Sequence, residues 1–320
     1  MSKVIGVIFS DLHINDWAKF NKNDERTLNH FKVLSIIKKA CNKYDCPAFF
    51  CGDMFHKPEN MSLHLHRLVV EYFNKAWNHT VRFISGNHCI NTTSKIGEKP
   101  ESWINNFAKQ YYWLQSLDYD TYTDEKNKVQ YHGIPYIDHN IGLNEYIKEM
   151  ALDTKYKQVL LLHTDYPGAQ DTDGTEVGTS ENLNTNLLDK FNLVLIGHIH
   201  KPQRLSKKVY MVGAPLQQRR TDKDCDLGYW LLHEDLKMQF VSLSDKFPKF
   251  IDVESEEDIK DDGNYYTVIS SKVEVEVGKT RITKRLSKKR LVRRYLKEKG
   301  IKDEKKENLL LDIIKDSEND

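Results

Sequence analysis

Five apolar runs in this chain each end in residues that can bind a metal ion. Short, β-rich runs of this kind, in which Arg82 is the one charged residue, are typical of buried strands. The runs span residues 4–9, 48–51, 81–84, 159–162 and 193–196. The polar residues that end them are Asp11 and His13, then Asp53, then Asn87 and His88, then His163, and finally His198 and His200. Ligands of open α/β sheets bind outside the carboxyl ends of the strands, so the sequence predicts one shared site.

The segments between and after these runs predict an α/β architecture. Apolar residues recur at helical spacing from Leu28 to Cys41 and again from Leu65 to Trp77. Later β-rich runs at 209–212, 229–233 and 238–243 predict three further strands. Strands that alternate with helices favour an α/β sandwich, which we expect to occupy residues 1–245.

The pattern changes after residue 245. Residues 252–262 contain seven acids and one lysine, and a small β segment is predicted over 265–277, so residues 246–280 are expected to form an acidic linker with a small cap-like β segment. Residues 279–299 contain eleven Lys or Arg and one acid. Helices are predicted over 283–299, before Gly300, and from Asp303 onward. They give a basic helical extension at residues 281–320.

Composition limits the partners and the compartment. The 320 residues include 48 Lys or Arg and 47 Asp or Glu, so net charge indicates no general attraction to nucleic acid or membrane. The five cysteines are odd in number and form no CxxC pair, which favours a cytoplasmic chain with reduced thiols. The apolar run at the N-terminus is too short for a signal peptide, and we expect no membrane partner.

The predicted ligands have a recognisable chemistry. Two Asp, one Asn and four His combine oxygen and imidazole donors, which suits Mn, Fe or Zn better than Ca or a lone Mg. Seven ligands are too many for one ion, so we expect two divalent ions, roughly 3.5–4 Å apart, bridged by a carboxylate. Two such ions against two carboxylates leave positive charge that would attract a phosphate ester. Gly52, Gly86 and Gly197 each precede a ligand residue and are expected to permit tight turns.

These motifs resemble those of a known enzyme family. DLH, GD, GNH, a strand-end His163 and GHIH resemble the calcineurin-like metallophosphoesterases over residues 1–245. The resemblance implies a two-sheet sandwich flanked by helices, with a small cap segment and a C-terminal helical extension. GDMFHKPEN, which contains His56, and VYMVGAPLQQ resemble the SbcD-type DNA repair nuclease subunits. The length of the chain resembles that of phage-encoded recombination nuclease subunits.

The resemblance also implies roles. Asp11, His13 and His200 would hold one ion, Asn87, His163 and His198 the other, and Asp53 would bridge them. His88 would contact the scissile phosphate or protonate the leaving oxygen. Such enzymes are typically manganese-dependent exonucleases and endonucleases that act on DNA. The extension at 281–320 would dock an SbcC-type, SMC-like ATPase. A homodimer would form through helices at 65–77 and at a helix carrying Trp103, Phe107, Tyr111 and Leu114.

Two alternatives to a nuclease stay open: a small-molecule or protein phosphatase of the same superfamily, and a non-catalytic scaffold. The basic extension argues against the first, and the complete ligand set against the second. The histidines outside these motifs carry no predicted function; among them, His64 and His66 are expected at the surface, and the others are His30, His79, His132, His139 and His233.

Cys89 departs from the family pattern, because an acid usually follows the GNH motif. A thiol is a weak hydrogen-bond acceptor, so His88 is expected to be less basic and less firmly oriented here. Another acid could substitute, and the candidates are Asp16, Asp24 and Glu98. Alternatively, Cys89 packs as a small buried residue, or it forms a thiolate paired with a metal or with His88. The segment at 246–280 is also shorter than the cap of larger relatives.

Overall fold

The computed structural model describes residues 2–75, 77–90, 97–137, 142–178 and 183–269, with the backbone of 276–277 and 280–281. The helices expected at 283–299 and from Asp303, and His139, lie outside these residues. The first of two compact units comprises Met1–Ile251 and Lys260–Tyr266 and contains every predicted site residue. In the described part of the second unit, a 3₁₀ turn at Glu256–Asp258 is capped by the Ser255 hydroxyl, which donates to Asp258 at 2.9 Å.

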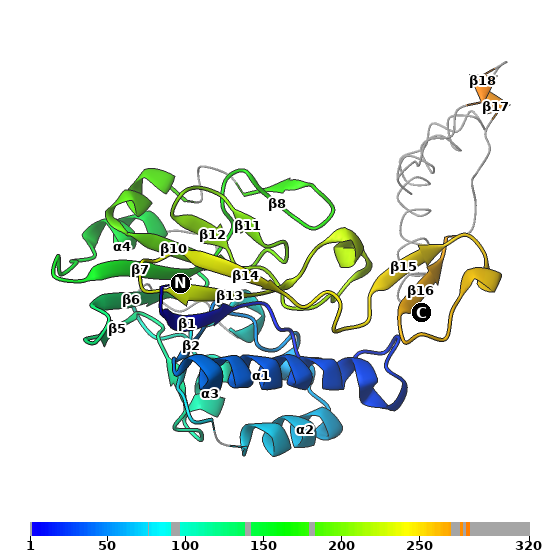
Figure 1. The fold of residues 1–320 in the computed structure, drawn as a ribbon, viewed down its shortest axis with the longest axis horizontal. Helices are drawn as coiled ribbons and strands as arrows, with labels where there is room; N and C mark the ends of the chain where they lie inside the picture. The colour runs from blue at the N-terminus through cyan, green and yellow to red at the C-terminus, as the bar shows by residue number, and fades with distance from the viewer. Residues whose placement is uncertain are drawn as a thin grey trace, which may run out of the picture. The chain divides into compact units, whose positions relative to one another are not determined.

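Two six-stranded sheets form the centre of the first unit. Their strand orders are β14-β13-β1-β2-β3-β4 and β11-β12-β10-β7-β6-β5. The strands of the first sheet are β1 (Val4–Phe9), β2 (Ala48–Phe50), β3 (Val81–Phe83), β4 (Leu114–Ser116), β13 (Gly228–His233) and β14 (Met238–Ser242). Those of the second are β5 (Asp120–Asp124), β6 (Val129–Ile134), β7 (Lys157–His163), β10 (Leu193–Gly197), β11 (Gln203–Arg204) and β12 (Val209–Met211). The expected two-sheet sandwich is confirmed (Figure 1).

Alternate residues of the central strands enter different cores. In β10, Leu193 and Leu195 join the core between the sheets, whereas Val194 and Ile196 join the core on the outer face of the second sheet. Both faces are therefore buried, which explains why this strand is a continuous apolar run instead of an alternating one. The same division holds in β7, where Val159 and Leu161 enter the first of these cores and Leu160 and Leu162 the second.

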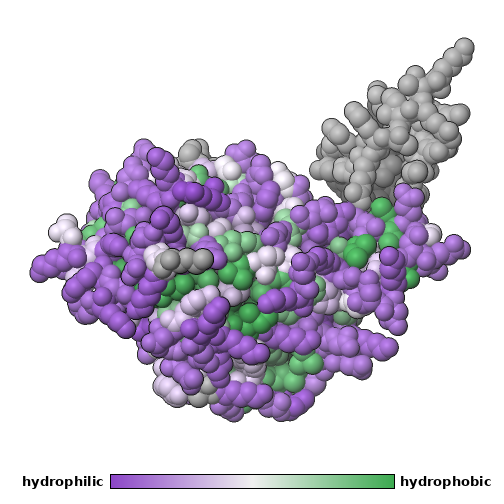
Figure 2. Space-filling model, in the orientation of Figure 1, coloured by the Kyte–Doolittle hydropathy of each residue, from purple (hydrophilic) through white to green (hydrophobic). Residues whose placement is uncertain are grey.

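Helices cover the outer faces of both sheets. The first sheet packs against α1 (Glu25–Tyr44), α2 (Leu63–Phe73) and α3 (Trp103–Ala108), which lie together on one side of β1 and β2 in Figure 1. The second sheet packs against α4 (Leu143–Glu149) and a 3₁₀ helix, η5 (Thr185–Lys190). Figure 2 shows hydrophilic side chains over most of the visible face of this unit. The large apolar side chains exposed among the described residues are Phe20, Leu63, Tyr112 and Ile259.

Two helix predictions need correction. The helix expected to reach Trp77 ends at Phe73, although Trp77 is still buried in the same core. The helix expected from Trp103 to Leu114 is wrong beyond Ala108, because Leu114 begins β4 and pairs with Val81 of β3. Helical spacing there arose from residues that enter one core from a helix, a turn and a strand.

Small hairpins complete the described chain. β8 (Ala169–Gln170) pairs with β9 (Glu176–Val177), β15 (Phe250–Val253) with β16 (Tyr265–Val268), and β17 (Glu276–Val277) with β18 (Thr280–Arg281). The β segment expected at 265–277 thus contains β16 and β17. All five cysteines are free thiols. Across the described residues, no helix has both the length and the apolar character that crossing a bilayer requires.

Candidate metal centre

The predicted site residues converge because their strands run parallel and in register. Phe9 of β1 is aligned with Phe50 of β2, and Phe50 with Phe83 of β3. Gly197 of β10 is aligned with His163 of β7. The loops that follow these residues therefore leave the two sheets at one end. They bring together all the predicted residues, which are Asp11, His13, Asp53, Asn87, His88, His163, His198 and His200.

Asp11, His13 and His200 form the first cluster, and their ligand atoms lie within 4.8 Å of one another. The Nε2 atoms of His13 and His200 are 3.3 Å apart. Nε2 of His13 is 3.9 Å from Oδ1 of Asp11. One carboxylate and two imidazoles thus face a common point.

Asp53, His163 and His198 form the second cluster, also with ligand atoms within 4.8 Å of one another. Asn87 adds a neutral oxygen to it. Its Oδ1 lies 3.0 Å from Nε2 of His163 and 2.9 Å from Nδ1 of His198. The second group therefore offers two oxygens and two imidazole nitrogens.

Asp53 lies between the two clusters. Its Oδ2 is 3.7 Å from Nε2 of His13 and 3.2 Å from Nε2 of His163. Its Oδ1 accepts a hydrogen bond from the main-chain N–H of His88 at 2.9 Å. One oxygen is therefore held by the backbone while the other faces both groups.

The backbone at several of these residues is strained. Asp11, His13, Asp53 and His198 have φ values of 49°, 48°, 61° and 97°. Side chains other than glycine seldom adopt this left-handed region, and strain of this kind concentrates at functional sites. A glycine would relieve the strain but would remove the ligand atom.

The glycines before the ligands have two different functions. Gly52 has a φ of 106°, so the expected tight turn is confirmed there. Gly86 and Gly197 do not have positive φ. A Cβ atom at Gly86 would clash with Asp53, and one at Gly197 would clash with the carbonyl oxygen of Cys51. These two glycines are needed because another segment of the same chain approaches closely, and not because the backbone makes a turn.

Main-chain and carboxylate groups orient the imidazoles from behind. Nδ1 of His163 donates to the carbonyl oxygen of Cys51 at 2.7 Å, which directs Nε2 towards the cluster. Nδ1 of His200 lies 3.6 Å from Oδ2 of Asp222, a fully buried carboxylate. The main-chain N–H of Gln218 donates to the same oxygen at 2.9 Å.

Two carboxylates that lie next to ligand histidines, Asp165 and Asp222, were not predicted from the sequence. Asp165, whose Oδ1 is 3.4 Å from Nε2 of His198, follows His163 by two residues, and that spacing could have marked it. Asp222 lies in the charged stretch RRTDKD and carries no comparable signal.

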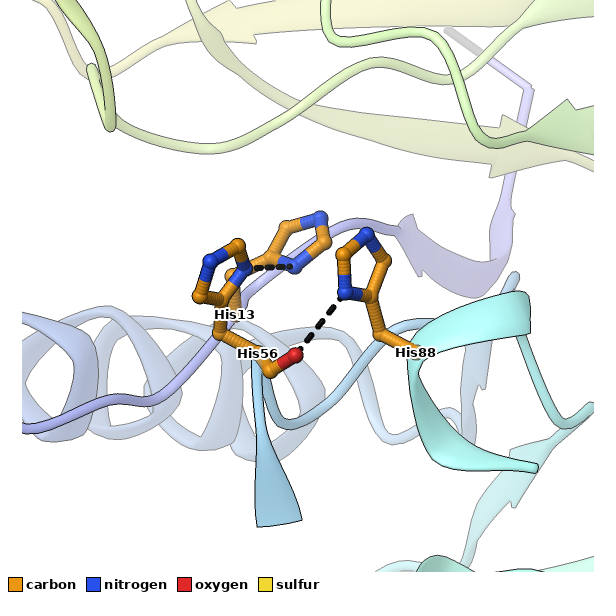
Figure 3. Close-up of side chains that lie close together, drawn as sticks. All are labelled: His13, His56 and His88. Carbon is orange, nitrogen blue, oxygen red and sulfur yellow. Dashed lines mark hydrogen bonds between the residues drawn. The ribbon is translucent and has the colours of Figure 1, made fainter. Parts of the chain in front are cut away.

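His13 of the first cluster also forms a compact group with His56 and His88 (Figure 3). The rings of His56 and His88 are stacked with centroids 4.9 Å apart. Nδ1 of His56 is 3.4 Å from Nδ1 of His13, and Nδ1 of His88 donates to the carbonyl oxygen of His56 at 2.8 Å. This leaves Nε2 of His88 available to a substrate.

The electrostatics of the site favour a bound cation. Burial lowers the pKa of His13 well below its usual value and that of His56 to about 4. Burial also acts to lower the pKa of His163. The Asp53 carboxylate has the larger effect and raises the pKa of His163 to about 9. Burial would raise the pKa of Asp53, yet His163 and its hydrogen bond hold it below the usual value. A divalent ion between these atoms would replace the imidazolium proton.

A cavity of about 230 Å³ opens beside both clusters. Its lining includes ligand residues of each cluster, His88 and Arg219. The guanidinium Nη2 of Arg219 contacts both carboxylate oxygens of Asp171, at 2.6 and 2.7 Å. A half-exposed guanidinium in a cavity with two cation sites suits an anionic substrate.

Cys89 is only 1% exposed and lies in the core beneath α1–α3. Burial raises the pKa of its thiol to about 12, so it is neutral. Of the acids proposed as substitutes, Asp16 accepts from the main-chain N–H of Ser62 and Asp24 pairs with His64 at 2.7 Å. Within the described residues, none of Asp16, Asp24 and Glu98 contacts His88. The packing interpretation of Cys89 is therefore the one that fits.

The histidines outside the motifs occupy ordinary positions. His64 and His66 are exposed on α2, as predicted. His30, His132 and His233 are buried with polar partners, and His79 is near Asp45.

Comparisons with known proteins identify the family of the chain. Residues 7–202, more than half of the chain, match the model of the calcineurin-like phosphoesterases. The SbcD component of the nuclease SbcCD from Staphylococcus epidermidis (strain ATCC 12228 / FDA PCI 1200) is 23% identical over 247 residues, which cover 69% of this chain and 65% of that relative. This chain thus spans less than two thirds of the relative's length.

A solved structure, that of the Pseudomonas putida nuclease MPE, is 16% identical, with 64% of this chain and 66% of that chain covered. Its TM-score of 0.29 is too low to support an argument. The match of the family model to more than half of the chain carries the assignment: this chain belongs to the calcineurin-like phosphoesterase family.

Proposed function

We propose that the chain is a two-metal phosphodiesterase that cuts DNA. The family implies divalent metal ions, and the described His and Asp clusters could hold them. The observation that carries the proposal is the position of Asp53, whose Oδ2 lies within 3.7 Å of an imidazole nitrogen in each cluster. A carboxylate between two imidazole groups is the arrangement that a bridged pair of ions requires.

The ligands divide between the ions as follows. Asp11, His13 and His200 would hold one ion, and Asn87, His163 and His198 would hold the other. Asp53 would be a ligand shared by both. A mixed set of oxygen and imidazole donors suits Mn, Fe or Zn, and among these we propose manganese because of the resemblance to manganese-dependent nucleases. When bound, two divalent ions supply Lewis acidity towards a phosphate and lower the pKa of water.

The side chains around the clusters would then act on the phosphodiester. Nδ1 of His88 is engaged by the His56 carbonyl, so the doubly protonated imidazolium form of His88 would use Nε2 to donate to a phosphate oxygen or to give its proton to the leaving oxygen. Arg219 faces the same cavity and would hold a neighbouring phosphate through its planar guanidinium.

Two features support DNA as the substrate. The relative from Staphylococcus epidermidis is, by its name, part of a nuclease. Residues 279–299 carry eleven Lys or Arg, enough to contact several phosphates. We therefore propose a cytoplasmic exonuclease or endonuclease that processes DNA ends in repair or recombination with an SbcC-type, SMC-like ATPase.

The activity test compares three substrates. With Mn²⁺, we expect cleavage of labelled duplex or single-stranded DNA and of bis(p-nitrophenyl) phosphate. Hydrolysis of p-nitrophenyl phosphate without cleavage of DNA would favour a phosphatase. No hydrolysis of any of them would favour a scaffold.

The metal assignment is tested at Asp53. Asp53→Asn keeps the shape of the side chain and tolerates the φ of 61°, which alanine would not. We expect loss of the bridging charge to lower Mn²⁺ affinity and to reduce DNA cleavage at least 100-fold, as removal of a main catalytic interaction does. Cleavage within tenfold of the wild type, by the Mn²⁺-loaded variant, would refute the two-metal assignment.

The partner and the dimer need separate measurements. Truncation after residue 279 should preserve hydrolysis of the small diester and abolish co-purification with an SbcC-type ATPase. Unchanged co-purification would refute docking through residues 281–320.

We also propose a homodimer through the region of α2 and α3, where Leu63 is 90% exposed. Light scattering at micromolar concentration should give twice the monomer mass, and a monomer mass would exclude it.

A further inference from the structure

A second cavity, of about 790 Å³, lies at the opposite end of the second sheet. Its lining includes Lys157 and Gln158, the first residues of β7, whereas the site residue His163 is the last residue of that strand. At about 3.3 Å per residue, β7 separates the cavity from the metal centre by roughly 20 Å. The cavity is therefore no part of the site described above.

Five lysines and no carboxylate residue line this cavity. The lysines are Lys128, Lys148, Lys155, Lys157 and Lys190. Only Lys128 has a carboxylate partner among the described residues, Glu125 at 3.0 Å. Four of the five ammonium groups thus have no carboxylate partner in the described part of the chain, and the lining carries a net positive charge.

Two of the ammonium groups are held in place by backbone. Nζ of Lys157 donates to the carbonyl oxygen of Glu234 at 2.7 Å. Nζ of Lys190 donates to the carbonyl oxygen of Met150 at 2.9 Å. Burial lowers the pKa of Lys190, so an anion in the cavity would favour its charged form. These contacts fix two charges without cancelling either of them.

Neutral donors complete the lining. Oδ1 of Asn192 accepts from the main-chain N–H of Gln158 at 2.7 Å, so its amide NH₂ group remains as a donor. Lys148 and Lys155 are exposed and flank the same space. A set of point charges with added donors matches an extended row of phosphates better than a single ion.

We infer that this lysine cavity binds the phosphate backbone of a nucleic-acid strand as a contact remote from the metal centre. The inference rests on the proposed function for the choice of nucleic acid over a free polyphosphate. The free energy of this binding comes from the release of counterions from the phosphates. The contact is therefore independent of the base sequence and weakens as the salt concentration rises. It would hold DNA to the enzyme without touching the scissile phosphate.

The test uses the full chain with Lys148→Gln and Lys155→Gln combined, because neither side chain has a described partner to lose. The matched control is Lys39→Gln with Lys43→Gln on α1, two exposed lysines outside the cavity. Binding of a labelled DNA duplex is measured by anisotropy in EDTA across a salt series. Binding of tripolyphosphate is measured by calorimetry.

A plot of log affinity against log salt has a negative slope, and each lost phosphate contact reduces its magnitude by about 0.9. We therefore expect the cavity variant, which loses two contacts, to reduce the magnitude of the slope by about 1.8. The control should leave the slope unchanged. Hydrolysis of bis(p-nitrophenyl) phosphate should be the same in all three proteins. A slope equal to that of the control would overturn the inference. So would tripolyphosphate binding that the cavity variant loses while its DNA binding is unchanged. If the wild type binds DNA through this cavity yet cleaves none, the proposed function fails and this inference stands.

Discussion

Nδ1 of His88 donates a hydrogen bond to the main-chain carbonyl oxygen of His56 at 2.8 Å. A carbonyl can only accept, so this contact requires the proton on Nδ1 and directs Nε2 away from His56. It supplies the orientation that sequence analysis expected an acid at position 89 to provide. The expectation that His88 is poorly oriented for lack of that acid is therefore wrong.

Cys89→Asp should accordingly give no gain in activity. The new carboxyl would be buried near Asp53, so its pKa would rise above about 3.9, the ordinary value for Asp. A raised carboxyl pKa makes the variant less stable as pH increases above that value, because only the unfolded chain ionises freely. Thermal melts from pH 4 to 8 should diverge increasingly from those of the wild type.

Cys89→Ala is the matched control, since it removes the thiol without adding charge. Its pH–rate profile on a DNA substrate should overlap that of the wild type. Higher cleavage by Cys89→Asp near neutral pH would show that an acid at this position does orient His88.

Asp222→Asn should weaken metal binding while the fold is retained. The carboxylate lies behind Nδ1 of His200 and, against the cost of burial, raises the pKa of that imidazole. Loss of a partner of this kind typically lowers metal affinity about 10–100-fold. Mn²⁺ titration by calorimetry measures it, with Asp235→Asn, an exposed carboxylate paired with Lys237, as control. Equal Mn²⁺ affinity in both variants would show that Asp222 does not support His200.

The metal-free protein should lose stability between about pH 6.5 and 9. The pKa of His163 is raised to about 9 in the folded chain, against about 6.5 in the unfolded chain. The protonated His163 therefore contributes fully to the free energy of unfolding below about pH 6.5, and this contribution is lost as pH rises through about 9. The loss is up to about 3 kcal/mol. Mn²⁺ requires neutral imidazole, so its affinity should rise over the same range.

Urea denaturation in EDTA at several pH values checks the first part of this prediction. His163→Gln should remove the part of the pH dependence that comes from His163 and leave the part from His200, whose pKa is also raised, whereas His64→Gln, at an exposed position, should keep all of it. A stability that is constant from pH 6.5 to 9 in the wild type would contradict the assignment of the charge to His163.

The strand-end ligands could be predicted from sequence because two local signals coincide at each of them. An apolar run such as 193–196 marks a strand buried on both faces, and GHIH directly after it marks the carboxyl end. Parallel pairing then brings separate loops together without any long-range information. The fold class followed from the same reasoning.

Other features depend on tertiary packing and left no local signal. Tyr111 and Leu114 have helical spacing with Trp103, yet they enter the core from a turn and from β4. Asp222 is buried behind His200 although its neighbours in sequence are basic. The five lysines of the remote cavity come from four separate segments, with Lys155 and Lys157 in the same one, and meet only in the folded chain.

Arg26 links the segment that contains Phe250 and Tyr265 to the metal centre. It is 6% exposed, and its guanidinium lies 3.9 Å from the ring centre of Trp17, 5.3 Å from that of Phe250 and 5.5 Å from that of Tyr265. It donates to the carbonyl oxygen of Gln218 at 2.5 Å. The Gln218 side chain in turn donates to the carbonyl oxygen of Asp11, a predicted ligand.

Arg26→Lys should therefore destabilise the protein and weaken Mn²⁺ binding, even though it keeps the charge. An ammonium cannot stack on several rings and reach the carbonyl oxygens of both Lys19 and Gln218, which Arg26 does now. An unsatisfied buried carbonyl costs roughly 1–3 kcal/mol. The control is Arg67→Lys on α2, where the guanidinium is exposed and paired with Glu71, and where a change within about 0.5 kcal/mol is expected. Urea denaturation and Mn²⁺ titration of both variants check the prediction, and an Arg26→Lys protein that matches the Arg67→Lys control in both measurements would refute it.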